Sequence, residues 1–95
     1  MQTLEKTLAE LDSEKSVAAF LTDLCTPAER RALTERWAVA QLLDRDELSY
    51  REIHAKSGVS TTTIGRVARF LRDEPHGGYR FALEQVTNNK LKEKT

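Results

Sequence analysis

Residues 49–67 read SYREIHAKSGVSTTTIGRV, and this stretch decides the fold because it predicts two short helices joined by a turn. Ser49 and Glu52 have the spacing of a capping box, in which the hydroxyl accepts from the Glu52 amide and the carboxylate accepts from the Ser49 amide. Gly58 stands where the chain must turn through a positive φ, which glycine adopts without steric penalty. Ser60 is placed to cap the second helix. The stretch is therefore typical of a helix-turn-helix.

The spacing of the apolar residues indicates which side of each helix is buried. Ile53 supplies the inward face of the first helix, and Ile64, Val67 and Leu71 follow helical spacing in the second. In a DNA-reading helix-turn-helix, the second helix enters the major groove. The first turn of that helix carries Thr61, Thr62 and Thr63. Their short side chains can donate, accept, or place a methyl group against a thymine.

Charge is divided unevenly along the chain. The whole sequence is neutral, with 15 basic and 15 acidic residues. From Ser49 to Arg72, however, five basic residues stand against one acid, whereas residues 1–48 hold six basic residues and ten acids. The motif thus carries a local charge of +4 beside a segment of −4. This separation is what a phosphate-facing module in a neutral protein would show.

The length and composition predict one small domain, residues 1–95. A chain this short buries a modest fraction of its surface, so a partner subunit would help to complete its core. No apolar run approaches the roughly 20 residues of a membrane span, and the start of the chain lacks the pattern of a secretory signal. Cys25 is the single cysteine and is interpreted as a small buried side chain. We therefore expect a cytoplasmic protein that does not bind membranes.

Two amphipathic helices are predicted before residue 25. Leu4, Leu8 and Leu11 define a first helix that stops near residues 12–13, and either Asp12 or Ser13 can cap the next. The apolar face of the second helix consists of Val17, Phe20, Leu21 and Leu24. These helices either fold back on their own subunit or cross to a second one. We prefer an intertwined homodimer, whose two-fold axis would place two recognition helices about 34–36 Å apart, one turn of DNA.

A third helix and a last helix flank the motif. Thr26 and Glu29 form a second capping box around Pro27, and the helix that they start runs to about Leu43. The last helix follows the break at residues 74–78, and we expect Asn88-Asn89 to end it. Residues 90–95 would form a charged tail that frays. The sequence thus predicts an all-α fold of about six helices with a helix-turn-helix at residues 49–72.

Several segments match a known family in order and spacing. They are DLCTP at 23–27, RWAVA at 36–40 with Leu42-Leu43, SYREI at 49–53, GVST at 58–61 with Ile64 and Arg66-Val67, and Gly78-Tyr79 with Ala82-Leu83. Together they resemble the Trp repressor superfamily, in particular its YerC/YecD-type members. The resemblance covers about residues 23–86, roughly two thirds of the chain.

The resemblance implies an intertwined all-α homodimer that binds operator DNA as a transcriptional regulator. In the tryptophan-binding members, tryptophan lies beside the DNA-reading helices. Three polar positions of that pocket are matched here by Thr26, Arg36 and Arg66, which form a candidate effector pocket. DNA-facing positions of the family are matched by Arg51, Thr61, Thr62 and Gly65.

Two residues depart from the pattern of the tryptophan-binding members. Val67 and Phe70 stand where those proteins carry glycine and serine. A valine and a phenyl ring at these positions would fill the space of the indole. We therefore interpret the protein as one that does not bind tryptophan in that mode, and we expect no cofactor. A repressor gated by tryptophan or by another small effector is the alternative.

The leading hypothesis is a sequence-specific DNA-binding regulator, in the first instance a repressor, that binds double-stranded DNA as a homodimer. The residues assigned to phosphates or bases are Arg51, Lys56, Ser60, Thr61, Thr62, Thr63, Gly65, Arg69 and Arg72. Gly65 lies in mid-helix, where glycine costs about 1 kcal/mol relative to alanine. A close approach to DNA, flexing of the helix, or a tight contact within the chain would each account for it.

Two other classes of function compete with this hypothesis. A helical dimer that binds other proteins and no longer meets DNA is the alternative, and the neutral net charge fits it. An enzyme is poorly supported, because no Cys/His cluster has metal-ligand spacing and no glycine-rich loop follows a strand. The pair Gly77-Gly78 is interpreted as a turn.

Overall fold

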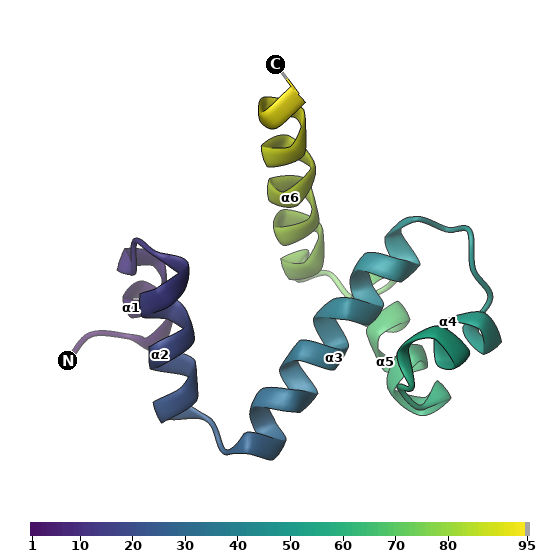
Figure 1. Ribbon diagram of the computed structural model, residues 1–95, viewed down its shortest axis with the longest axis horizontal. Coiled ribbons are helices and arrows are strands. Elements are labelled where there is room, and N and C mark those ends of the chain that lie inside the picture. Colours follow the sequence, from purple (N-terminus) through teal and green to yellow (C-terminus); the bar gives the residue numbers. More distant parts are fainter. Residues whose placement is uncertain (95) are drawn as a thin grey trace. The chain divides into compact units, whose positions relative to one another are not determined.

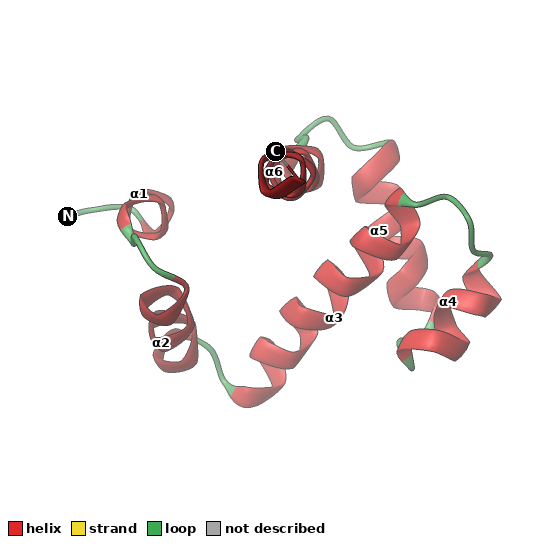
Figure 2. Ribbon diagram, turned by 45° about the horizontal axis from the view of Figure 1, so that its top comes forward, coloured by secondary structure: helices red, strands yellow, loops and turns green. Residues whose placement is uncertain are grey.

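The computed structural model describes residues 1–94, except the side chain of Lys94, and six helices form within this range (Figure 1). They are α1 (Leu4–Glu10), α2 (Glu14–Leu24), α3 (Pro27–Asp44), α4 (Tyr50–Ser57), α5 (Thr61–Arg72) and α6 (Gly78–Lys94). Only helices and loops occur in this part of the chain, so the predicted all-α class is confirmed (Figure 2). The chain forms two compact units, Met1–Leu33 and the residues from Thr34 onward, and α3 begins in the first and continues in the second.

The first unit contains two short capped helices, α1 and α2, in which no residue is fully buried. Thr3 accepts from the amide of Lys6 at 3.1 Å, and Ser13, the second of the two predicted caps, accepts from the amide of Ser16 at 3.0 Å. Neither α1 nor α2 contains a buried residue. Leu4 is 46% exposed and Leu24 is 50% exposed. The apolar faces of these helices are therefore only partly covered in the described chain: Leu4 and Leu24 are exposed, and the other large apolar residues, Leu8, Val17, Phe20 and Leu21, are half-buried.

The start of α3 is fixed by the capping box expected from the sequence. The Thr26 amide donates to the Glu29 carboxylate at 2.8 Å, and the Glu29 amide donates to the Thr26 hydroxyl at 3.2 Å. These hydrogen bonds satisfy two of the amides that a helix start leaves without partners. The helix ends at Asp44, and Asp46 then adopts the left-handed conformation (φ 54°), which aspartate tolerates better than most residues.

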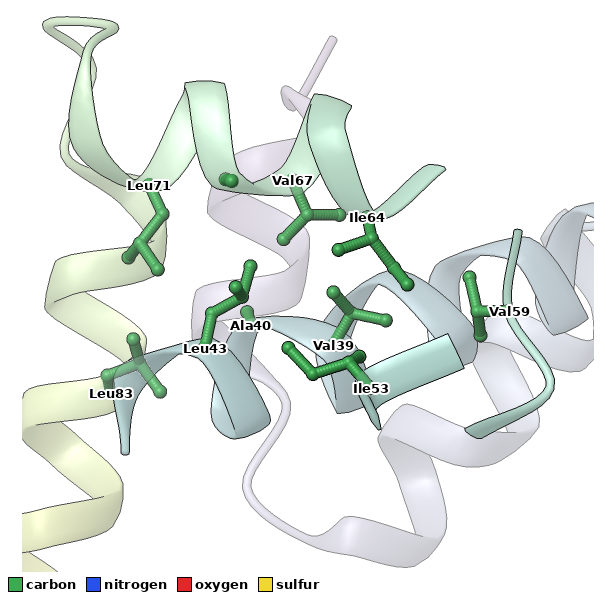
Figure 3. Close-up of a cluster of buried hydrophobic side chains, with 10 residues drawn as sticks. Val39, Ala40, Leu43, Ile53, Val59, Ile64, Val67, Leu71 and Leu83 are labelled. Carbon is green, nitrogen blue, oxygen red and sulfur yellow. The ribbon is translucent and has the colours of Figure 1, made fainter. Parts of the chain in front are cut away.

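The core of the second unit lies between α3 and α5 (Figure 3). From α5, the side chains of Ile64, Val67 and Leu71 extend toward α3, which faces them with residues that include Ala40 and Leu43. The other members of this core are Val39, Ile53, Val59, Ala68 and Leu83. All ten are apolar and at most 6% exposed. The apolar spacing read from the sequence therefore identifies the buried side of α5 correctly.

The prediction that Asn88-Asn89 ends the last helix is wrong. Helix α6 continues through both asparagines to Lys94, and Thr95 lies outside the described residues. An asparagine costs a helix at most about 0.7 kcal/mol relative to alanine, and the five residues from Lys90 include good helix formers such as leucine, lysine and glutamate. The charged segment therefore extends the helix instead of forming a separate tail.

No helix among the described residues is long and apolar enough to cross a membrane.

Candidate nucleic-acid interface

Helix α4 begins at the capping box predicted from Ser49 and Glu52. The Ser49 amide donates to the Glu52 carboxylate at 3.0 Å, and the Glu52 amide donates to the Ser49 hydroxyl at 3.1 Å. The hydrogen bond that the Glu52 carboxylate accepts from the Ser49 amide lowers the pKa of Glu52 below its ordinary value. The interaction of the carboxylate with the Ser49 side chain lowers it further. The charged carboxylate is therefore part of what holds the first turn of α4 in place.

The turn between α4 and α5 is closed by hydrogen bonds that the sequence did not reveal. Gly58 has a φ of 75°, and its amide donates to the carbonyl of His54 at 2.8 Å. His54 Nδ1 lies 2.7 Å from the Val59 carbonyl, and because a carbonyl only accepts, this nitrogen carries the proton. The Ser57 hydroxyl donates to the Ile53 carbonyl at 2.6 Å and accepts from the Val59 amide at 3.1 Å. The order of helix, glycine turn and helix is thus fixed locally.

The three threonines of α5 have different surroundings. The Ser60 hydroxyl accepts from the Thr63 amide at 3.2 Å and donates to the Thr63 hydroxyl at 3.1 Å, so these two side chains cap the helix. Thr61 and Thr62 are exposed, and within the described chain their hydroxyls have no hydrogen-bond partner. Thr61 and Thr62 are therefore free to meet an external surface, whereas Ser60 and Thr63 are already engaged with each other.

The exposed basic residues of the motif lie on both helices. Arg51 and Lys56 are exposed on α4, and Arg66, Arg69 and Arg72 are exposed on α5. Two of the arginines face carboxylates that no local sequence pattern connects with them. Arg69 lies 3.5 Å from Glu74, and Arg72 lies 3.8 Å from Asp46. Exposed pairs of this kind contribute about 0–1 kcal/mol, so a phosphate can compete with the carboxylate for either arginine.

Phe70 is surrounded by cationic and aromatic groups. The guanidinium carbon of Arg66 lies 4.5 Å from the centroid of its ring, and that of Arg69 lies 5.6 Å away. The His76 ring stacks on it with the centroids 6.1 Å apart. Phe70 and His76 also line a hollow of about 400 Å³ together with Trp37 and Tyr79. Phe70 is therefore the ring against which the Arg66 side chain lies.

The candidate effector residues are spread over both units. Arg36 is half-buried on α3 and Arg66 is exposed on α5, both in the second unit. Thr26 belongs to the first unit, where its hydroxyl caps α3. Val67 is 1% exposed and packs in the core. Phe70, the other residue expected to fill the indole position, lies against the candidate effector residue Arg66.

One explanation for Gly65 is excluded by the packing. A Cβ atom added at Gly65 would meet nothing within 4 Å outside its own helix backbone. A tight contact within the described chain is therefore not the reason for glycine at this position. The positive φ that requires glycine at Gly58 is also absent from Gly65.

Comparison with known proteins identifies the relatives of the chain. The family described as Trp repressor protein matches residues 1–87. An uncharacterized protein of Bacillus subtilis (strain 168), YerC, is 40% identical over 67 residues, which are 70% of this chain. The matched region covers 62% of that relative, so the chain spans less than two thirds of its length. The family resemblance inferred from the residue segments is confirmed.

The lowered pKa of Glu52 predicts that acid weakens α4. A carboxylate whose pKa is depressed by folding adds stability above its unfolded pKa of about 4.5, and this contribution is lost as the pH falls through the lower folded value. Glu52→Gln keeps an acceptor for the Ser49 amide but cannot titrate. The melting temperature of the wild type should therefore exceed that of Glu52→Gln at pH 7, and the difference should shrink as the pH falls below about 4.5.

Thermal denaturation followed by circular dichroism at fixed protein concentration measures this difference. Glu47→Gln, in the loop before α4, is the matched control for the loss of one exposed carboxylate outside the capping box. A constant difference between wild type and Glu52→Gln from pH 7 to pH 3 would contradict the role of the carboxylate.

Proposed function

This chain belongs to the Trp repressor family, and on that basis we propose that it is a sequence-specific DNA-binding regulator of transcription, acting as a repressor. The family is one of non-enzymatic regulators that bind DNA as dimers. The observation that carries the proposal is the outer face of the α4–α5 pair, which combines unpartnered threonine hydroxyls with exposed arginines. Such a role places the protein in the cytoplasm, with the DNA.

We assign two kinds of DNA contact to this face. Arg51, Lys56, Arg69 and Arg72 would neutralise phosphates, and Thr61 and Thr62 would lie against base edges in the major groove. We assign Ser60 and Thr63 an indirect role in DNA binding. Their hydroxyls cap the start of α5 and so hold the turn that carries Thr61 and Thr62. Arg51 is also a candidate for a base contact. Water-mediated readout, as in the Trp repressor itself, needs no long base-reading side chains.

We further propose that the chain acts as a homodimer. The uncovered apolar residues of α1 and α2 support this, because helices with no buried residue gain little from packing within one chain. The second unit also leaves apolar side chains exposed on α6, where Phe81 is 71% exposed and Leu91 is 58% exposed. A second copy that covers both sets would supply the missing core.

The contacts of Phe70 support regulation without tryptophan. A phenyl ring already lies 4.5 Å from the Arg66 guanidinium, the group that we regarded as part of a candidate effector pocket. Thr26, the third candidate, already uses its hydroxyl to cap α3. We therefore propose that the recognition helix is held in place by the chain's own side chains instead of by a bound indole. Tryptophan gating is the alternative, and it predicts that added tryptophan changes the duplex affinity.

Selection of bound sequences from a random duplex library, with and without tryptophan, tests the proposed function. A homodimer should select palindromes whose half-sites lie about 10 base pairs apart. Leu24→Glu places a charge on the uncovered face of α2 and should convert the dimer to monomers in sedimentation velocity, with loss of palindrome binding. Lys15→Glu, on an exposed position of the same helix, is the control. A monomeric wild type would contradict the dimer.

Phosphate contacts predict a steep dependence of duplex affinity on salt. Each phosphate neutralised contributes about 0.9 to the slope of log K against log salt concentration, so Arg69→Ala should lower the slope by about 0.9 per protomer. Fluorescence anisotropy from 50 to 300 mM salt measures it, with Arg31→Ala, exposed on α3 outside the motif, as the control. Undetectable binding at low salt would instead favour a dimer that binds other proteins.

The arrangement of Phe70 predicts that tryptophan changes neither the duplex affinity nor the melting temperature of the wild type. A ligand at 100 times its dissociation constant would stabilise the folded state by about 2.7 kcal/mol, which is readily detected. Phe70→Ser removes the ring from Arg66 and should weaken duplex binding. A tryptophan-dependent rise in the duplex affinity of the wild type would show instead that a small effector gates the protein.

A further inference from the structure

Gly65 is a glycine that nothing in the described chain requires. It lies in the interior of α5 (Thr61–Arg72), where glycine lowers helix stability by about 1 kcal/mol relative to alanine. Its backbone is not in the left-handed region, and a Cβ atom would meet open space. Gly58 provides the contrast, since its φ of 75° explains glycine there without reference to a partner. Neither packing nor backbone conformation within the described chain therefore accounts for Gly65.

The surroundings of Gly65 place it on the outer face of α5. Thr61 and Thr62 lie one turn before it and Arg69 lies one turn after it, which puts all three on its side of the helix. These three side chains are exposed, whereas Ala68, three residues after Gly65, and Ile64 are buried in the core. Gly65 is thus a half-buried position without a side chain, at the edge of the exposed face of α5 where it borders the core. We call this gap, bounded by Thr61, Thr62 and Arg69, the Gly65 notch.

The chemistry of the notch selects among the groups that DNA presents. The amide of Gly65 is committed to the hydrogen-bond ladder of the helix, so a phosphate would gain no donor by entering the notch. What glycine adds to the surface here is its Cα, an apolar carbon, and each of the two neighbouring threonines carries a methyl group besides its hydroxyl. The one apolar group that a base pair presents in the major groove is the methyl group of thymine.

We infer that the Gly65 notch determines sequence specificity by admitting the methyl group of a thymine, which packs on the Gly65 backbone between Thr61 and Thr62. The missing side chain lets α5 approach that base pair more closely than any other residue would allow. This inference rests on the proposed binding of duplex DNA, and it adds to it the position and the chemical feature that are read.

Gly65→Ala tests the notch because the substitution should raise the stability of the protein and lower its affinity for duplex DNA. The variant should melt at a higher temperature than the wild type, since alanine is the better helix former and has free space. It should nevertheless bind the duplex selected by the wild type about tenfold more weakly, the range expected for one lost base contact. Gly78→Ala is the matched control: a Cβ atom there also meets nothing within 4 Å, and duplex affinity should not change.

Replacement of each thymine of the selected duplex by deoxyuridine identifies the methyl group. One symmetry-related pair of thymines should lose affinity for the wild type when the methyl group is removed, and Gly65→Ala should be insensitive to the same change. Equal affinity of Gly65→Ala and wild type would overturn the inference and leave the proposed function intact. So would a wild type that is insensitive to deoxyuridine at every position. Failure of the wild type and of Gly78→Ala to bind any duplex would overturn the proposed function, and the inference with it.

Discussion

The burial of one side of α5 against α3 is the constraint on which the rest of the second unit depends. Ile64 and Val67 are at most 1% exposed, and they meet Val39 and Ala40, which are completely buried (Figure 3). Because 3.6 residues complete one turn, fixing these inward positions also fixes which residues point outward. A rotation of α5 that exposed Thr63 further would remove a branched apolar side chain from the core, at a cost of several kcal/mol. The packing that forms the core therefore also fixes which residues of α5 face outward.

The sequence predicted those parts of the structure that depend on neighbours in the chain. The capping boxes at Ser49 and Thr26 join residues three positions apart, so their spacing alone identifies them. The pair of Arg72 and Asp46 joins residues that are distant in sequence, and no local pattern indicates it. The contact of His54 with Val59 escaped prediction for a different reason: a histidine near a turn has many possible partners, and only the backbone conformation selects one. The end of α6 was misplaced because asparagine is a weak helix breaker when good helix formers follow it.

The ion pairs of Arg69 with Glu74 and of Arg72 with Asp46 relate the zero net charge of the chain to its structure. Glu74 and Asp46 lie beside two of the arginines proposed to meet phosphates, so part of the acidic composition faces the motif directly. Both pairs are long, at 3.5 and 3.8 Å, and their arginines are 65% and 42% exposed. Weak ion pairs of this kind reduce the repulsion between the arginines, and a DNA phosphate can displace the carboxylate from either arginine. Local charge separation and a net charge of zero are therefore compatible with phosphate binding.

The two sides of α5 carry different kinds of residue, and this difference supports an external binding partner. The inner side follows packing, with branched apolar side chains that are almost completely buried. The outer side satisfies neither packing nor helix propensity, since Thr61, Thr62 and Gly65 each lower the stability of an isolated helix by up to about 1 kcal/mol. The first turn also lacks the acidic residue that would stabilise a helix start by about 0.3–1 kcal/mol. A helix chosen for stability alone would carry alanine, glutamate or lysine at these positions. Ile64 and Val67 carry similar small costs on the inner side, where burial in the core offsets them, whereas no contact within the described chain does so for Thr61, Thr62 and Gly65.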